Sequence, residues 1–477
     1  MESIWRKETP EILPRQNEAG NGHFDVIVIG AGMAGLLIAY YLQKAGKKVL
    51  VLEASRIGSG QTERTTAKIT SQHGLKYSTL ISTVGIEKAR LYAGANEEAI
   101  NEYERLIDEM HIDCDFSRLS SVLYYCYDKE LIEDETKAAK LCGLKAEFTD
   151  KAEIPLEIKG AVEFSNQAQF SPLKFVKAIA KELTILEHTK VTEIKDRVVI
   201  TRNGAYLADN IVIATHYPIL NIPGLYFMRQ HQERSSVLAL YGCDKLSSMY
   251  YGIDRRGLSF RQSGDFLLLG GGAHRTGRAG GVYEFLSKRA KQLYPDSKEV
   301  ARWSAQDCMP HDGIPFIGRY SLFRPHIFVA TGFQKWGMTS SMISALLIRD
   351  AICRIPNQYL SVFTPQRINL RASLPKLAMD VGISTMGIIK GFLHYPDKTS
   401  ASIPPGSGDI VRIGGVRYAC YKDEDGILHT ISARCPHLGC ELEWNDDEHS
   451  WDCPCHGSRF DIEGNLMENP SVKNNRH

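Results

Sequence analysis

The sequence lacks the features of a secreted or membrane-spanning protein. Residues 1–22 are polar and contain no apolar run of the kind found in a secretory signal. The most apolar late stretch, residues 377–393, is 17 residues long and includes Asp380, Lys390 and three glycines, whereas a spanning helix needs about 20 apolar residues. We therefore expect a packed or linker helix there, no transmembrane segment and a cytoplasmic protein, with peripheral membrane association left open.

The chain also has little net charge and no disulfide framework. Its 57 Lys and Arg residues against 56 Asp and Glu residues give a net charge of +1, so the composition offers no general attraction to nucleic acid. The charge is unevenly spread, because residues 401–477 carry 7 basic and 13 acidic side chains while the remainder carries 50 and 43. Either an acidic C-terminal module docks on a more basic body, or the domains simply vary in charge. Six of the 11 cysteines are scattered between positions 114 and 353 without metal-ligand spacing, and we expect them to be packed as small apolar side chains.

A dinucleotide-binding motif lies near the N-terminus. A β-branched strand, a glycine turn, an apolar helix and a second strand follow one another within residues 24–53, which is the Rossmann fingerprint. Gly30 permits the tight turn, Gly32 lets the backbone approach a pyrophosphate, and Gly35 lets the helix pack on the strand. Glu53 ends the second strand and is expected to accept a hydrogen bond from a ribose hydroxyl.

Outside this motif, the sequence has no second fingerprint of the same kind. Residues 269–272 are glycine-rich, but Ala273-His-Arg-Thr follows them instead of a helix-like run, so we interpret them as the end of a strand. Without a second dinucleotide site a reductase fed by NAD(P)H is disfavoured, and electrons are expected to come from an organic substrate.

Two Cys–His pairs occupy the last eighty residues. Cys435 and His437 form the first pair, Cys453 and His456 form the second, and 15 residues separate them. Two thiolates and two imidazoles are the ligands of a Rieske [2Fe–2S] centre, in which the cysteines hold one iron and the histidines the other. Two cysteines and two histidines also suit a tetrahedral zinc ion, which is the alternative.

The C-terminal region resembles Rieske proteins of the cytochrome bc type, which favours the cluster. The resemblance implies a disulfide between Cys440 and Cys455 and a hydrogen bond from Ser458 to a bridging sulfide. Where that class has tyrosine this chain has Phe460, so one donor to a ligand sulfur is absent and the potential is expected below the top of the range of about −150 to +300 mV. The chain stops at His477, earlier than such domains usually do, so the last strand pairing is expected to be incomplete.

Four further segments resemble the D-amino-acid oxidase-like family of FAD-dependent oxidoreductases. They are residues 58–67, 189–194, 209–215 and the pair 311–318 with 327–339. The first of them contains no histidine, so a covalent histidyl flavin is not expected. Besides the residues of the glycine motif, the FAD-binding residues that the resemblance implies are Thr66, Val191, Thr215, Gly332, Gly337, Met338 and Thr339.

The sequence does not identify a catalytic side chain. Flavin enzymes of this family take a hydride from a carbon next to nitrogen, which needs little acid or base when the amine arrives neutral. Lys335 either adds positive charge near the flavin or is a solvated surface lysine. A substrate with a carboxylate would need an arginine clamp. The candidates in the expected substrate region are Arg255, Arg256, Arg261, Arg275 and Arg278, with Tyr250, Tyr251 and His274.

These patterns predict an α/β Rossmann-type FAD-binding domain with an α+β substrate domain, followed by an all-β Rieske domain. The expected boundaries are a polar tail over 1–22, an oxidoreductase over 23–365, a linker or helix over 366–400 and the Rieske domain over 401–477. Within the oxidoreductase, FAD-binding parts are expected over 23–78, 156–225 and 305–360, with substrate or helical parts over 79–155 and 226–304.

The predicted function is that of a dehydrogenase of a small amine or amino acid. Electrons are expected to pass from FAD to the [2Fe–2S] cluster and on to an unknown acceptor, because an oxidase that reduces O2 directly needs no iron–sulfur relay. The alternatives are a non-catalytic flavin and Rieske electron carrier or redox sensor, and a reductase fed by a separate flavodoxin or ferredoxin.

Overall fold

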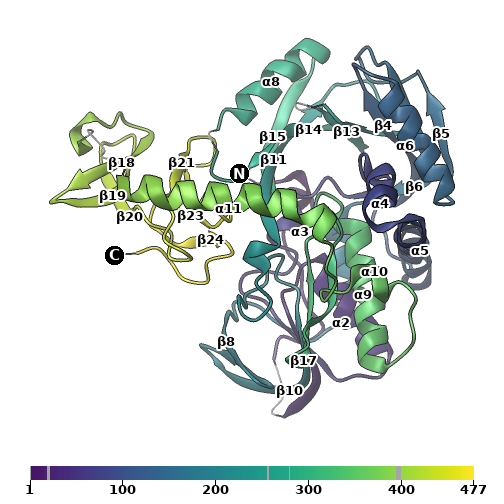
Figure 1. Ribbon diagram of the computed structural model, residues 1–477, viewed down its shortest axis with the longest axis horizontal. Coiled ribbons are helices and arrows are strands. Elements are labelled where there is room, and N and C mark those ends of the chain that lie inside the picture. The colour runs from purple at the N-terminus through teal and green to yellow at the C-terminus, as the bar shows by residue number, and fades with distance from the viewer. Residues whose placement is uncertain (1, 19–21, 255–256, 279, 394–398, 477) are drawn as a thin grey trace.

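The computed structural model describes residues 2–18, 22–254, 257–278, 280–393 and 399–476, with side chains omitted at 370 and 388–393. A large body contains two mixed sheets, and a smaller C-terminal lobe lies beside it (Figure 1). The long helix α11 (Leu370–Leu393) runs along the outside of both parts. No helix among the described residues is both long and apolar enough to cross a membrane.

The first sheet carries the glycine motif. Parallel strands β1 (His23–Ile29) and β2 (Val49–Leu52) flank helix α2 (Met33–Lys44), and β1 also pairs with β10 (Gly204–Ile213). The complete order of this path is β16 (Phe316–Ser321), β17 (Arg324–Thr331), β10, β1, β2 and β7 (Ile185–Leu186), with β8 (Val191–Lys195) and β9 (Val198–Thr201) joined to β10. Helices α2 and α9 (Gly337–Cys353) cover one face, and a second apolar cluster that contains Tyr217, Tyr226 and Tyr320 covers the other, so the apolar residues of β1 and β2 are buried on both sides.

The second sheet has nine strands and lies above the first in Figure 1. Its order is β15 (Lys298–Pro310), β11 (Gln230–Tyr241), β14 (Phe266–Arg275), β13 (Ser259–Ser263), β12 (Met249–Gly252), β4 (Ser117–Tyr125), β6 (Gly160–Gln169) and β3 (Lys68–Ile69), with β5 (Ala146–Thr149) on β6. The helices around the body are α1 (Ile4–Glu8), α3 (Gln61–Arg64), α4 (Lys76–Val84), α5 (Ile86–Met110), α6 (Glu130–Leu141), α7 (Pro172–Ala180), η1 (Tyr226–Met228), α8 (Val282–Leu293) and α10 (Leu360–Phe363).

Two of the expected domain boundaries do not match the way the strands are divided between the two sheets. β6 lies inside the stretch 156–225 expected in the FAD-binding part, yet it pairs with β4 in the second sheet. The reason is that its apolar positions, such as Val162 and Phe164, complete the core beneath β4. The stretch 79–155 is likewise not only helical, since β4 and β5 lie within it.

Residues 1–22 are not merely a polar tail. Helix α1 places Ile4 and Trp5 in the main hydrophobic core, Trp5 with no exposed surface, and Ile12 is buried in the same core. Three apolar side chains in a polar stretch give no periodic pattern, so their burial could not be read from the sequence.

The C-terminal lobe is built from two small antiparallel sheets. One contains β18 (Ser407–Ile413), β19 (Val416–Lys422) and β20 (Leu428–Ser432), and η2 (Ser400–Ser402) precedes it. The other contains β21 (Glu443–Asn445), β22 (Ser450–Asp452), β23 (Arg459–Phe460) and β24 (Leu466–Glu468).

The end of the chain folds back onto this lobe. The backbone N–H of Asn475 donates to the Gly464 carbonyl oxygen at 2.7 Å, and its side-chain amide donates to the Ser432 oxygen at 2.8 Å. The expectation of an incomplete last pairing is therefore corrected in one respect: β24 is paired with β23, and the residues after it are hydrogen-bonded across the lobe.

Candidate flavin and iron–sulfur sites

The glycine loop after β1 has the geometry of a dinucleotide site. Gly30 adopts φ +105°, and a Cβ there would lie 2.6 Å from the Ala214 carbonyl oxygen. A Cβ on Gly35 would lie 1.9 Å from the Gly30 oxygen, whereas one on Gly32 would meet only the Thr62 hydroxyl, at 3.1 Å. The loop therefore needs glycine at both ends for packing, and its middle remains approachable, as a pyrophosphate requires.

Glu53 lies directly against this loop. Its carboxylate accepts hydrogen bonds from the backbone N–H groups of Ala31 (2.8 Å) and Ser55 (2.7 Å). Burial raises the pKa of Glu53, and the two backbone donors oppose this rise. A carboxylate held at the end of β2 beside the loop fits the ribose of FAD.

The other expected FAD-binding residues converge on the same edge of the first sheet. Thr215 follows β10 and Gly332 follows β17, so both lie at carboxyl ends of strands parallel to β1. Val191 begins β8, and the neighbouring Thr189 donates its backbone N–H to the Glu53 carbonyl oxygen at 2.7 Å. Gly337, Met338 and Thr339 form the first turn of α9, which offers a positive dipole end to a reduced flavin.

The loop that contains Thr66 is held from two sides. Trp5 donates its indole N–H to the Thr65 carbonyl oxygen at 2.8 Å, and Arg261 donates to the Thr66 oxygen. The Arg261 guanidinium lies 5.0 Å from the centre of the Trp5 ring. Trp5 therefore supports the loop expected to bind FAD, a role that the sequence did not reveal.

Two further buried groups near the expected flavin have pKa values shifted toward neutrality. Lys68 follows the Thr66 loop, donates to the Ser259 hydroxyl at 2.6 Å, and burial lowers its pKa to about 7. Asp307 lies 3.5 Å from the Lys335 ammonium, and burial raises its pKa to about 6. Such shifts are common at functional sites.

Lys335 is not a solvated surface lysine. Its side chain is only 17% exposed, and although burial opposes it, the Asp307 carboxylate raises the pKa of Lys335. The neighbouring Trp336 stacks on His73 at 4.7 Å and meets Tyr251 edge-on at 5.2 Å. A permanent positive charge is therefore held two residues before the α9 N-terminus.

The described arginines that were proposed as a carboxylate clamp either make other contacts or are exposed. Arg261 is fully engaged with the Thr66 and Phe170 carbonyl oxygens and the Gln169 side chain. Arg275 faces the C-terminal lobe, and Arg278 is exposed. Arg255 and Arg256 lie outside the described residues, Tyr250 is hydrogen-bonded to Glu153, and His274 is bonded to the Gly272 oxygen.

One sizeable cavity of the described residues is not lined by any of the expected FAD-binding residues. It measures about 970 Å³ and lies between β14 and α8, with Tyr124, His274 and Phe285 among its lining residues. We therefore do not assign it to the flavin.

In the C-terminal lobe the four cluster ligands come together. Cys435 and Cys453 are buried, and their mutual interaction raises the pKa of Cys435 and lowers that of Cys453. The rings of His437 and His456 are 5.1 Å apart, and both nitrogens of His437 and Nδ1 of His456 have no partner among the described residues. Unpaired buried imidazoles are costly, so this set fits a metal cluster.

The surroundings of the ligands also fit a Rieske cluster. A disulfide joins Cys440 to Cys455, and Ser458 is buried with its hydroxyl beside Cys435 and accepting from the Ser471 N–H at 2.9 Å. Helix α11 passes directly over the disulfide, since a Cβ on Gly387 would lie 2.9 Å from the Cys455 sulfur.

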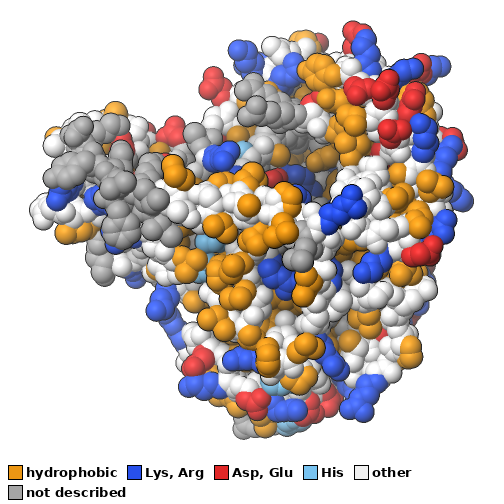
Figure 2. Space-filling model, in the orientation of Figure 1, with side chains coloured by type: hydrophobic (Ala, Val, Ile, Leu, Met, Phe, Trp, Pro, Cys, Tyr) orange, Lys and Arg blue, Asp and Glu red, His pale blue; other side chains and the backbone are white. Residues whose placement is uncertain are grey.

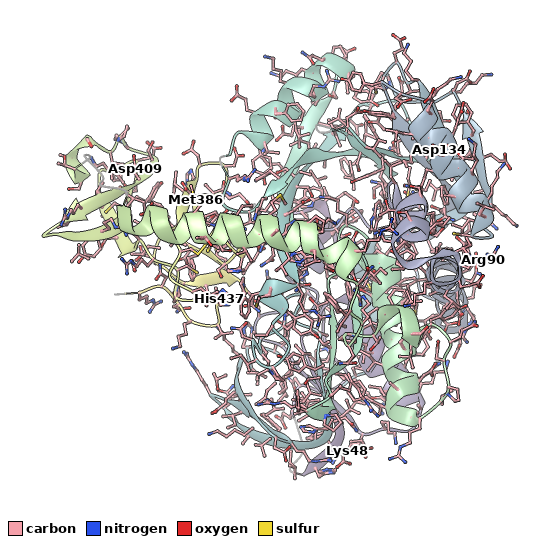
Figure 3. All side chains as sticks on the ribbon, viewed as in Figure 1. Lys48, Arg90, Asp134, Met386, Asp409 and His437 are labelled. Atoms are coloured by element: carbon pink, nitrogen blue, oxygen red, sulfur yellow. A yellow bond between two sulfur atoms is a disulfide. The ribbon has the colours of Figure 1, made fainter. Side chains whose placement is uncertain are left out.

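The cluster end of the lobe faces the flavin-binding body. Phe227 of η1 meets His437 at 5.7 Å and His456 at 5.8 Å between ring centres, both edge-on. Figure 3 shows His437 at the junction between the lobe and the body, below α11. Gln232 donates to the His456 carbonyl oxygen at 3.0 Å, which fixes the ligand loop against β11.

Ion pairs across this junction join acidic side chains of the C-terminal lobe to arginines of the body. Glu468 of the lobe pairs with Arg64 at 2.7 Å and with Arg234 at 3.3 Å, and Glu448 also pairs with Arg234. The Glu468 side chain is only 12% exposed, which by itself would raise its pKa, yet the positive charges of Arg459, Arg234 and Arg64 lower the pKa to about 2. Because Arg64 belongs to α3 in the loop before Thr66, one carboxylate connects the lobe to the flavin loop.

A second junction connects the ligand loop, the body and α11. Arg275 donates to the carbonyl oxygens of Pro454 (3.2 Å) and Cys455 (2.8 Å) and pairs with Asp380 of α11. Asp380 also contacts His311 at 2.8 Å and His231 at 3.4 Å. Two histidines and a carboxylate could hold a metal ion, but Arg275 already neutralises this carboxylate, so we interpret the group as an ion-pair network.

Comparisons with known proteins agree with both sites. The family model of FAD dependent oxidoreductases (DAO) matches residues 25–351, and that of the Rieske [2Fe-2S] domain matches residues 394–476. The Bacillus subtilis (strain 168) protein YhfW, described as a Rieske 2Fe-2S iron-sulfur protein, is 37% identical over 493 residues, covering 99% of this chain and 96% of its own.

Glycine oxidase resembles the flavin-binding body alone. The enzyme from Geobacillus kaustophilus (strain HTA426) is 25% identical over 373 residues, covering 69% of this chain and 93% of its own. A crystal structure of glycine oxidase from Geobacillus kaustophilus superposes with a TM-score of 0.61 and 20% identity, covering 73% of this chain and all of the other. That of L-proline dehydrogenase from P. horikoshii gives 0.61 and 18%, covering 74% and 98%.

The chain belongs to the family of FAD-dependent oxidoreductases and carries a C-terminal Rieske [2Fe–2S] domain. The predicted fold class, FAD and the iron–sulfur cluster are confirmed, and the zinc alternative is set aside.

Proposed function

We propose that this protein is a dehydrogenase of a small amine or amino acid that transfers electrons through its own Rieske cluster. The observation that carries the proposal is the orientation of the lobe, because both histidine ligands face Phe227 of the flavin-binding body. A cluster that exchanged electrons only with outside proteins would have no need of its ligand edge against this body.

Bound FAD supplies a two-electron acceptor, and the bound cluster supplies a one-electron carrier. Oxidation of an amine removes a hydride from the carbon next to nitrogen and leaves an imine, which water hydrolyses. The chain's own contribution is electrostatic: the α9 N-terminus and the Lys335 ammonium favour negative charge where the resemblance places the flavin ring.

Among the described candidate arginines, none is buried and free to clamp a carboxylate, which favours an amine without one. Arg261 and Arg275 are the two least exposed of them, and backbone oxygens and side chains already engage their guanidinium groups. The similarity to glycine oxidase keeps small amino acids in the tested set.

A non-catalytic carrier or sensor remains the alternative, but Lys68 and Asp307 favour an enzyme. Both groups lie beside segments expected to bind FAD, and burial shifts both pKa values toward neutrality, which would suit a group that takes a proton from the amine before hydride loss.

Anaerobic titration of the holoprotein tests the proposal. The panel comprises simple amines, glycine, N-methyl amino acids and D-amino acids, followed by visible absorbance and EPR. We expect flavin bleaching and then a Rieske-type EPR signal with at least one of them. If no compound bleaches the flavin while dithionite reduces both centres, the dehydrogenase assignment is wrong and the carrier is favoured.

A further inference from the structure

The outward face of α11 is apolar, which is the reverse of an ordinary surface helix. Its acidic residue, Asp380, points inward and is buried against Arg275 and His311. Four apolar side chains on the outward face are 50–66% exposed: Leu374, Met379, Val381 and Met386. A surface helix normally buries its apolar stripe and exposes its polar one.

This apolar face continues beyond the helix. Ile368, just before α11, is 83% exposed. Leu225, just before η1, and Met228, the last residue of η1, are partly exposed, and η1 contacts α11. Leu438, next to the cluster ligand His437, is 47% exposed on the neighbouring ligand loop. Figure 2 shows hydrophobic side chains gathered over α11 and below it, with Lys and Arg side chains at the margins.

Among the described residues of α11, the exposed charged side chains are all basic. Arg371 and Lys376 are exposed, and Asp380 is the only acid in residues 370–393. An apolar face with basic margins is complementary to an anionic lipid surface, which supplies both an apolar layer and negative headgroups.

We propose that the outward face of α11 binds the surface of an anionic membrane, with the helix lying in the plane of the interface. At about 1.5 Å per residue its 24 residues extend for roughly 36 Å, so the helix offers a long flat contact. Binding of this kind combines apolar burial with about 1 kcal/mol of attraction for each Lys or Arg near the surface. The helix does not need to cross the bilayer for this contact.

Flotation of the oxidised holoprotein with lipid vesicles tests this proposal without any substrate. Vesicles of phosphatidylcholine are compared with vesicles containing one quarter phosphatidylglycerol, at low and high salt. We expect flotation with the anionic vesicles, weakened by salt because surface attraction is screened. Since no turnover is needed, a failure here leaves the proposed dehydrogenase untouched.

Matched variants locate the contact. Leu374→Glu and Met386→Glu are each expected to weaken vesicle binding more than tenfold, because an exposed apolar side chain that would enter the membrane surface is replaced by a charge of the wrong sign. Leu322→Glu makes the same change at a 75% exposed position in the β16–β17 turn and is expected to bind like the parent protein. Arg371→Gln and Lys376→Gln should each weaken binding about fivefold, and Lys245→Gln, at a 72% exposed side chain, should not.

Two results overturn the proposal. One is absence of flotation with anionic vesicles, or equal flotation of Leu374→Glu and the parent protein. The other is a concentration-dependent dimer in light scattering that Met386→Glu abolishes while vesicle binding stays absent, since the face would then be covered by a second copy of the chain.

Discussion

At the scale of single residues, Phe460 is the clearest departure from the pattern of high-potential Rieske centres. It is fully buried in the core of the lobe, two positions after Ser458. The ring packs there and has no hydroxyl to donate to the cluster, so we expect the position to tune the potential independently of the four ligands.

We expect Phe460→Tyr to raise the midpoint potential of the cluster by about 50 mV, since a hydrogen bond worth ~1 kcal/mol shifts a one-electron couple by roughly that amount. Protein-film voltammetry measures the shift. Phe460→Leu, which removes the ring without adding a donor, is the control and should not raise the potential. An unchanged or lower potential in the tyrosine variant would contradict this role.

Asp307 gives a prediction with a defined pH window. Its pKa in the folded protein is about 6, above the usual value of 3.8, so its protonated form is favoured by folding. The stability it contributes is present below about pH 4 and is lost as pH rises through 6. The melting temperature of the parent protein should therefore fall relative to that of Asp307→Asn between pH 4 and 7. Asp265→Asn, at a 71% exposed side chain, is the control, and parallel pH profiles for Asp307→Asn and the parent would refute the shift.

At the scale of elements, the short helix α1 holds the loop that includes Thr66 in place. Trp5 donates to the Thr65 oxygen, and Arg6 pairs with Glu63 at 2.7 Å in the same loop. A helix of only five residues thus fixes the position of a loop that is expected to lie along the flavin ring.

Trp5→Ala is expected to cost about 3–5 kcal/mol of stability, as for other buried tryptophans, and to loosen FAD. The temperature at which flavin fluorescence is released should fall, and it should fall before the Rieske absorbance is lost. Trp5→Phe keeps most of the packing and removes only the hydrogen bond to Thr65, so its effect should be much smaller. Simultaneous loss of both signals in Trp5→Ala would argue that α1 supports the whole molecule and not this loop.

The sequence predicted the elements whose chemistry is concentrated in a short motif. The Gly30 loop with Glu53 and the two Cys–His pairs are local, and backbone geometry explains each of them. The sequence did not predict the contacts that join distant segments. Trp5 contacts Thr65, and Arg275 contacts Cys455, 180 residues further along the chain. A lone arginine in a substrate region looks like a substrate ligand, and only the fold shows that its partners are backbone oxygens of the ligand loop.

At the scale of the whole molecule, the lobe is attached to the body through charge and through its cluster ligands. Glu448 and Glu468 meet Arg234, and the fully buried Arg459 supports both acids from within the lobe. Acidic residues of the lobe thus pair with basic residues of the body, which agrees with the interpretation that the acidic C-terminal module docks on the more basic part of the chain.

We expect Arg234→Gln to slow electron transfer from the flavin to the cluster at least tenfold without changing the rate at which the flavin is reduced. The reason is that Glu448 and Glu468 lose a buried partner at the junction, and such losses cost several kcal/mol. Arg302→Gln, which removes a partly exposed pair with Glu299, is the matched control. Equal slowing of both steps would instead indicate damage to the flavin site.

Flash photoreduction of the flavin in the anaerobic holoprotein tests the central claim most directly, because it needs no substrate. We predict that cluster reduction follows in a first-order phase whose rate is independent of protein concentration, and that Phe227→Ala slows this phase. A cluster that stays oxidised, or a rate that rises in proportion to protein concentration, would contradict transfer within one chain.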